Sequence, residues 1–422
     1  MVRVGVSVVD ITPPVGLAMT GFGARTLPAE GVHDPLTARA LVIGDTAIVV
    51  ADVLGIEAAM SERIRTRCGL PASAVVVAAV HNHGGPVSMA GRLGADADPD
   101  YLSVLESGCV EAITRAHESS VEASLHFGYG VDPDIARNRR HADGAVDRSL
   151  PVLVACNQAG EAIAVLTSYA CHPVVLDATN LLWTADYPYF LRTEIEKAFP
   201  GAVCLFLTGC AGDLNTGHSA HASLSLTKNS ARTFEAAQDI GRAIATCAIA
   251  AKLEPIAEPE VAFAEEFVRL DFERREVEPL HLLAQQWEAG AENASSQQSL
   301  VLPIWARWAR RFAEDPLVPI SVRVSALRWG GLGLVALPGE IFAETSIDIR
   351  CLSNLSGFVI CYADDNPGYI APESEYTSGG YEVDEAHRYY GMPATFAKGS
   401  AEKLVGAASR ALAAAQNYKQ AE

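Results

Sequence analysis

The chain has 422 residues, of which 49% are hydrophobic and 20% charged, a composition that is ordinary for a globular protein with a sizeable buried core. No hydrophobic run free of charged and turn residues reaches membrane-spanning length, so we do not expect an integral membrane protein. The formal net charge of −19 would repel nucleic acid and anionic lipid, and neither is an expected partner.

The amino-terminal residues resemble a strand rather than a secretory signal. They alternate hydrophobic and small residues, and they lack the continuous apolar core and the small-residue cleavage site of a signal peptide. We therefore predict a cytoplasmic protein without stable membrane association. The nine cysteines form no CxxC pair, which predicts reduced thiols and argues against a cysteine zinc site.

Strands and helices are both predicted along the chain. Small turn residues separate hydrophobic runs in three predicted hairpins, which cover residues 38–52, 152–169 and 326–337. Hydrophobic residues recur at helical spacing at about 58–68, 100–118, 187–198, 230–252, 340–352 and 398–416. The expected fold class is α/β, with mixed, largely antiparallel β-sheets flanked by helices. Because no repeat or long linker divides the chain, residues 1–422 are predicted to form a single catalytic domain.

The segment 278–315 differs from the rest of the chain. It has two helical pieces around a polar stretch, and the second piece places Trp305, Trp308 and Phe312 at helical spacing beside several arginines. One interpretation is an amphipathic helix packed on the core or at a subunit interface, so a homo-oligomer stays open. The other is a lid over the active site.

Four polar clusters each follow directly on a predicted hydrophobic strand. They are His81-Asn82-His83, His172-Pro173, Gly209 to Asp213, and Pro338-Gly339-Glu340. Strand ends in α/β proteins are where a rigid sheet presents functional loops, so these clusters are expected to converge on one cleft.

Two imidazoles two residues apart lie on one side of an extended backbone, so His81 and His83 are candidate metal ligands. A surface loop or a hydrogen-bonded histidine pair explains the same motif equally well. His172 alone is more typical of a structural histidine, and Glu340 of a first-turn acid in a helix. Together, imidazoles and a carboxylate form a ligand set that suits Zn²⁺, which would activate a water molecule.

The series of motifs resembles the catalytic domain of the neutral/alkaline non-lysosomal ceramidase family, zinc amidases that cut the N-acyl bond of ceramide. Order and spacing are kept over about residues 3–400. The matching stretches are Val8-Val9-Asp10-Ile11-Thr12, Gly21-Phe22-Gly23, Gly31 to Leu36, His81 to Pro86, Asn138-Arg139, Ala170-Cys171-His172-Pro173, Ala185-Asp186-Tyr187, Gly212 to Asn215, Pro338-Gly339-Glu340, Gly368-Tyr369-Ile370, Glu375-Tyr376 and Tyr381-Glu382.

The resemblance implies a role for each residue that matches a family motif. The implied zinc ligands are His81, His172, Glu340 and Tyr369. The implied catalytic residues are His83, which would carry a proton, and Arg139 and Tyr381, which would bind the scissile carbonyl and its oxyanion. Arg137 and Arg140 are close enough for the arginine assignment to shift.

Departures from the family concern the substrate more than the metal. Asn82 and Gly84 stand where the family has Thr and Ser, and we expect neither the secretory start nor the carboxy-terminal immunoglobulin-like domain of known ceramidases. The predicted function is a zinc-dependent amidohydrolase that cleaves an N-acyl bond of a small, soluble substrate. The alternatives are hydrolysis of an ester, lactam or cyclic amide, a true ceramidase, and a non-catalytic metal-binding relic.

Overall fold

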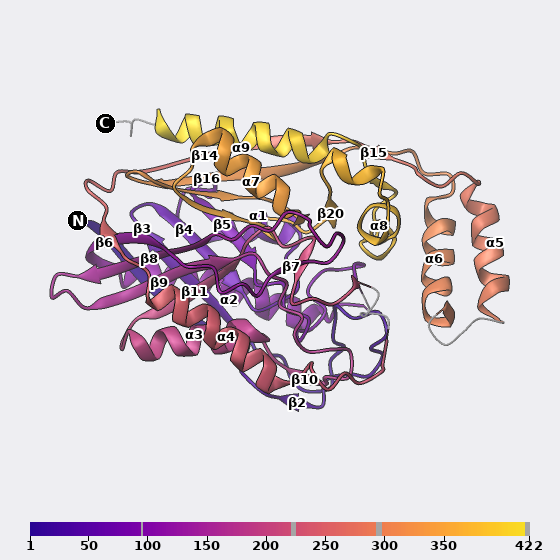
Figure 1. Cartoon of the computed structure of the whole chain (residues 1–422), viewed down its shortest axis with the longest axis horizontal. Helices are drawn as coiled ribbons and strands as arrows, with labels where there is room; N and C mark the ends of the chain where they lie inside the picture. The colour runs from indigo at the N-terminus through magenta and orange to yellow at the C-terminus, as the bar shows by residue number, and fades with distance from the viewer. Residues whose placement is uncertain (94–95, 221–224, 293–297, 418–422) are drawn as a thin grey trace.

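The computed structural model describes residues 1–93, 96–220, 225–292 and 298–417, and these form four layers (Figure 1). Helices α7 (Ala343–Ser353) and α9 (Ser400–Gln416) cover the outer face of a small sheet. A larger sheet packs against the inner face of the small one. Helices α3 (Tyr187–Ala198) and α4 (Phe234–Ile249) cover the other side of the larger sheet.

The larger sheet is mixed and mostly antiparallel. Its strand order is β11-β9-β8-β6-β1-β3-β4-β5, with β13 paired to β6. Only the two outermost pairs along this path, β11 with β9 and β4 with β5, are parallel. The bounds are β1 (Val2–Asp10), β3 (Thr37–Ile43), β4 (Thr46–Ala51), β5 (Val75–Ala79), β6 (Val121–Gly130), β8 (Leu150–Asn157), β9 (Ala162–Tyr169), β11 (Val203–Thr208) and β13 (Glu254–Pro255).

The smaller sheet has the order β14-β16-β17-β19, with bounds Val261–Leu270, Ile320–Trp329, Leu332–Ala336 and Gly357–Ile360. Hydrophobic side chains of both sheets form one cluster, which includes Ile48 and Val76 from the larger sheet and Trp329 and Phe358 from the smaller one. Each sheet therefore buries one face against the other. The expected α/β class with mixed, largely antiparallel sheets is confirmed.

All three predicted hairpins are present as antiparallel pairs, β3 with β4, β8 with β9, and β16 with β17. The predicted helices match α1 (Ala58–Arg67), α2 (Pro99–Glu118), α3, α4 and α9, with ends that differ by a few residues. The helix predicted at 340–352 is wrong at its start, because Glu340 lies in a short strand and α7 begins at Ala343. Glu340 is therefore a strand residue and not a first-turn helix acid.

Four short strand pairs tie loops together around the ends of the larger sheet. They are β2 (Gly31–Val32) with β10 (Leu182–Trp183), β7 (Arg137–Asn138) with β12 (Leu214–Asn215), β15 (Phe272–Glu273) with β21 (Thr395–Phe396), and β18 (Glu340–Ile341) with β20 (Tyr369–Ile370). The last pair places Glu340 directly beside Tyr369, because these two residues are partners in a parallel register.

The segment after β19 joins the two edges of the larger sheet. The amide of Cys361 donates to the carbonyl of Thr208 at the end of β11, and the amide of Ala79 in β5 donates to the carbonyl of Tyr362. The hydroxyl of Thr208 also donates to the carbonyl of Val80. Strands β5 and β11, which are at opposite ends of the strand order, consequently finish next to each other.

Residues 278–315 contain helices α5 (Leu280–Ala291) and α6 (Gln298–Phe312), which lie side by side next to α8 (Ala386–Tyr389) at one end of the molecule (Figure 1). The indole N–H of Trp308 donates to the carbonyl of Met392, and that of Trp305 donates to the hydroxyl of Tyr389. Trp308 and Phe312 are buried. Among the described residues, none of the helices has the length and hydrophobicity needed to cross a membrane.

Candidate metal centre

Three of the four predicted strand-end clusters meet at one buried point. His81 follows β5, His172 follows β9, and Glu340 follows β17, and each is only 1% exposed. The Nε2 atom of His172 lies 3.0 Å from one carboxylate oxygen of Glu340, and Nε2 of His81 lies 3.4 Å from the other. The expected convergence of these clusters is therefore present. The fourth cluster contributes backbone, because the carbonyl of Ala211 contacts His172.

His83 completes a group of three histidines that could hold a metal ion. One ring nitrogen from each of His81, His83 and His172 lies within 4.8 Å of the others. Both ring nitrogens of His83 are buried and make no hydrogen bond to the described residues. The resemblance implied a proton carrier at His83 and not a metal ligand, whereas this geometry makes it a candidate ligand as well.

Backbone carbonyls fix the protonation of two of these rings. Nδ1 of His81 lies 2.6 Å from the carbonyl of Leu54, and Nδ1 of His172 lies 2.5 Å from the carbonyl of Ala211. A carbonyl oxygen can only accept, so each Nδ1 carries the proton and each Nε2 presents a lone pair. Such bonds to the second ring nitrogen are typical of metal-binding histidines.

The Nε2 lone pairs of His81 and His172 face the carboxylate oxygens of Glu340. Acceptors that face acceptors at 3.0 and 3.4 Å in a buried site need a cation or a proton between them. The donor set of imidazole nitrogens and a carboxylate suits a divalent transition metal such as Zn²⁺. The residues present therefore fit a metal ion.

Burial keeps the imidazoles neutral at physiological pH. Desolvation lowers the pKa of His81 to about 4, against the opposing charge of Glu340, and lowers the pKa of His172 to about 3. Desolvation also lowers the pKa of His83 well below its ordinary value, although part of that residue reaches solvent. Burial raises the pKa of Glu340. Neutral imidazoles are the form that binds metals.

The backbone at the H-x-H motif differs from the extended strand that we expected. His81 has a φ of 69°, in the left-handed region that non-glycine residues rarely adopt. The ring of Tyr362 stacks on His81 with 3.9 Å between centroids and 6° between planes, which holds the imidazole in place. A Cβ atom at Gly84 would lie 2.6 Å from the carbonyl oxygen of Thr184, so this glycine permits a close approach between chain segments.

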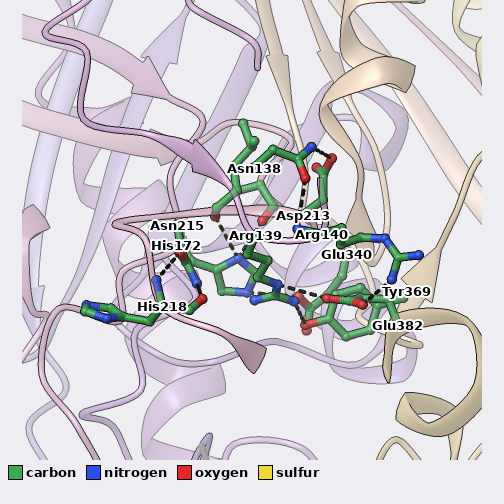
Figure 2. A network of polar contacts seen from close by, with 12 residues as sticks. Asn138, Arg139, Arg140, His172, Asp213, Asn215, His218, Glu340, Tyr369 and Glu382 are labelled. Carbon is green, nitrogen blue, oxygen red and sulfur yellow. Dashed lines mark hydrogen bonds and ion pairs between the residues drawn. The ribbon is translucent and has the colours of Figure 1, made fainter. Parts of the chain in front are cut away.

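Figure 2 shows a buried ion-pair network beside the histidines. Nε of Arg139 donates to Glu382 at 2.9 Å, and an Nη atom of Arg139 donates to the hydroxyl of Tyr369, also at 2.9 Å. Arg140 donates to the second oxygen of Glu382 and to Glu375. Glu382 thus binds two guanidinium groups at once, and Arg139 is the arginine that lies against Tyr369.

Arg137 does not reach this network, because its exposed guanidinium pairs with Asp134 at 3.1 Å. Tyr381 and Glu382 belong to a π-helical turn, Tyr381–Glu385. The ring centroids of Tyr381 and Tyr369 are 5.8 Å apart. A π-helical turn of this kind is frequent at functional sites. Arg139, Tyr369 and Tyr381 all line the small cavity of about 50 Å³ that also contains His83, His172 and Glu340.

Comparison with known proteins supports the resemblance found in the sequence. Residues 2–202 match the family described as neutral/alkaline non-lysosomal ceramidase, N-terminal. The chain is 24% identical over 229 residues to the neutral ceramidase of Drosophila pseudoobscura pseudoobscura, and 25% identical over 227 residues to that of Drosophila melanogaster. Over residues 2–202 the chain is therefore similar to the neutral/alkaline ceramidase family.

Each of these ceramidase matches covers 47% of this chain and 32% of the relative, so the chain spans about a third of the curated relatives' length. Two solved structures share the ceramidase fold. The neutral ceramidase from Pseudomonas aeruginosa has a TM-score of 0.73 at 18% identity, over 97% of this chain and 74% of that one. A ceramidase complexed with C2 has the same TM-score and identity, over 100% and 77%.

Two tyrosines of this site were not found from the sequence. The hydroxyl of Tyr390 donates to one carboxylate oxygen of Glu340, and the hydroxyl of Tyr362 lies 3.5 Å from the other. Both tyrosines are buried. Neither stands in a motif or at a strand end followed by a polar cluster, so the sequence carries no signal that distinguishes them from core tyrosines.

Arg25 was also missed. Its guanidinium donates to the carbonyl of His83 at 2.6 Å and to the carbonyl of Thr20, which ties the amino-terminal loop to the H-x-H motif. The Gly21-Phe22-Gly23 match pointed to this loop, but the resemblance gave no role to the arginine two residues later.

Proposed function

We propose that this protein is a metal-dependent amidohydrolase that cleaves the N-acyl bond of a small, soluble substrate, with Zn²⁺ as the metal. The observation that supports the proposal most strongly is the pair of histidine lone pairs that face a buried carboxylate, because a metal ion between these groups satisfies all of the facing acceptors at once. Similarity to ceramidases supports the choice of an amide bond.

The metal would be held by His81, His172 and Glu340, with Tyr369 as a fourth ligand. When bound, Zn²⁺ would supply an activated water molecule and polarise the substrate carbonyl. The hydroxyl of Tyr390 donates a hydrogen bond to the carboxylate of Glu340. The carbonyls of Leu54 and Ala211 accept hydrogen bonds from the two imidazoles. Contacts of this outer kind orient ligands and raise metal affinity.

Three residues would act on the substrate. Arg139 and Tyr381 line the cavity and carry N–H and O–H donors that suit an oxyanion. Glu382 and the hydroxyl of Tyr369 fix the guanidinium of Arg139 before the substrate arrives. His83 has buried ring nitrogens without partners among the described residues, and its neutral imidazole would accept a proton and pass it to the leaving amine.

True ceramidase activity is the second candidate, and the similarity to neutral ceramidases favours it. Against it stands the cavity next to the metal centre, which has a volume of about 430 Å³ and contains several arginines. Pockets for small molecules range over roughly 300–1,000 Å³, so this cavity suits a ligand at the small end of that range.

The test is a hydrolysis assay with mass-spectrometric detection on short N-acyl amides and amino acids, on matched esters, and on ceramide in vesicles. We expect cleavage of the soluble amides. Tyr381→Phe should keep the metal and slow turnover by roughly 10- to 1,000-fold, because one oxyanion donor is lost. Tyr101→Phe is the matched control, since its buried hydroxyl makes no hydrogen bond to the described residues.

Efficient cleavage of ceramide with no cleavage of soluble amides would contradict the proposed substrate. Cleavage of esters alone would contradict the proposed bond. Equal slowing in Tyr381→Phe and Tyr101→Phe would remove the proposed role of Tyr381.

A further inference from the structure

A second, larger cavity opens directly beside the metal centre. Its volume is about 430 Å³, and its lining shares Gly21, Phe22, Leu93 and Tyr381 with the small cavity around the histidines. One wall comes from the loop that precedes β2, and the opposite wall comes from helix α6. A substrate whose amide reached Tyr381 would therefore place the rest of its structure in this larger cavity.

The charge of this cavity is opposite to that of the chain. The protein has a formal net charge of −19. The described residues that line the cavity nevertheless include four arginines, Arg25, Arg307, Arg311 and Arg388, and no aspartate or glutamate. Low-dielectric walls of one sign of charge concentrate ligands of the opposite sign. The cavity therefore favours an anion.

The arginines of helix α6 differ in their contacts. Arg307 and Arg311 are four residues apart, so they lie one turn apart on the same helix face, and both line the cavity. Neither makes a hydrogen bond or an ion pair to any residue in the described part of the chain. Arg310, on the adjoining face, forms a two-pronged ion pair with Glu288 of α5. Only the cavity-facing arginines are left for a ligand.

The opposite wall adds a buried positive charge. Arg25 is 7% exposed, and its hydrogen bonds go to the carbonyls of Thr20, His83 and Asn180 rather than to a carboxylate. Its Nε atom is buried and has no partner among the described residues. Burial, opposed by the charge of Asp177, lowers the pKa of Arg25 to about 9, so the guanidinium is charged at neutral pH.

The fourth arginine has a structural partner. Arg388 pairs with Glu276 at 3.1 Å and stacks against Trp305 and Trp308, so it fastens α6 to α8. Hydrophobic groups, including Ile304 and Phe312, fill the space between the charged positions. The cavity thus combines a hydrophobic middle with a free positive charge at the α6 wall.

We propose that the larger cavity binds an anionic group of the substrate through Arg307 and Arg311, so that the preferred substrates are N-acyl compounds carrying a carboxylate or a phosphate. The proposal rests on the proposed function and names the substrate class for the same site. A guanidinium suits both anions because its N–H groups match their oxygens in pairs. The neutral headgroup of ceramide lacks this group.

The experiment measures binding and turnover separately. Binding of N-octanoylglycine, of its uncharged primary amide and of octyl phosphate is measured by calorimetry on chelator-treated protein. We expect the charged compounds to bind at least about 10-fold more tightly than the uncharged amide, as one or two charge-assisted hydrogen bonds predict. Whichever of the two anionic compounds binds with the higher affinity identifies the carboxylate or the phosphate as the natural group.

Variants assign the effect to the two arginines. Arg307→Gln with Arg311→Gln should abolish the preference for the anion, and it should raise KM for N-octanoylglycine by about 10- to 100-fold with little change in kcat. Arg310→Gln removes the same charge from the same helix and should change neither quantity. Equal binding of charged and uncharged compounds by the unaltered protein, or an equal effect of Arg310→Gln, would overturn the proposal.

The two proposals fail in different ways. If no amide is hydrolysed, the proposed hydrolase is refuted, and the calorimetric comparison still tests the anion site because it does not depend on turnover. If charged and uncharged amides are hydrolysed with the same KM, the proposed hydrolase stands and the anion site is refuted.

Discussion

Glu382 is the carboxylate on which the arrangement of Arg139 depends. It is 5% exposed and accepts hydrogen bonds from both Arg139 and Arg140. Glu382→Gln keeps the shape of the side chain but removes the charge between two buried guanidiniums. Removing one partner of a buried ion pair costs about 3–5 kcal/mol. Because the amide oxygen still accepts one hydrogen bond, we expect a loss near the lower end, about 3 kcal/mol.

The assay is urea unfolding followed by tryptophan fluorescence, in which this loss appears as a lower midpoint at an unchanged slope. Turnover should also fall by about 10- to 100-fold, the usual effect of removing a group that orients an active-site residue. Glu375→Gln is the control. Glu375 pairs with Arg140 and His141 but not with Arg139, so turnover should be nearly unchanged. The reasoning is refuted if Glu382→Gln unfolds like the unaltered protein, or if both variants lose the same turnover.

Two further predictions concern the metal ligand Glu340 and the packing of helices α4 and α9. Tyr390→Phe removes a hydrogen bond to Glu340 and should weaken zinc affinity by about 10- to 100-fold while circular dichroism stays unchanged; unaltered affinity in a competition assay with a chromophoric chelator would contradict this. Gly241→Ala should destabilise the fold by about 1–3 kcal/mol, because the new Cβ would lie 2.6 Å from the carbonyl oxygen of Tyr187 where α4 packs on α3. Gly406→Ala in α9 has more room, with Nη1 of Arg410 at 3.4 Å, and should stabilise by up to about 1 kcal/mol; a similar shift in melting temperature for both variants would refute the packing argument.

Local features were predictable because the sequence carries their physical cause. Hydrophobic runs around Gly44, Gly160 and Gly330 predicted the hairpins, and these glycines all have positive φ in turns. Polar residues after hydrophobic strands predicted where His172 and Glu340 would be. These signals are short-range, and the structure preserves them.

Features that depend on distant contacts were not predictable. His81 has a left-handed backbone, and its ring stacks on Tyr362, which is far away in the sequence. The position of Glu340 in a strand follows from its pairing with Tyr369 rather than from helix propensity. The ends of β5 and β11 meet through the bridging segment 360–364, and no sequence pattern near either strand predicts this contact.

Elemental analysis of protein purified without added metal tests whether His81, His172 and Glu340 hold a metal ion. We expect about one zinc ion per chain in the unaltered protein, and none in His172→Ala, because an incomplete ligand set does not retain the ion. His117→Ala, which removes an exposed histidine of α2, should keep the full content. Absence of any transition metal from the unaltered protein, with no uptake of added zinc, or an undiminished metal content in His172→Ala, would show that these residues do not form a metal site.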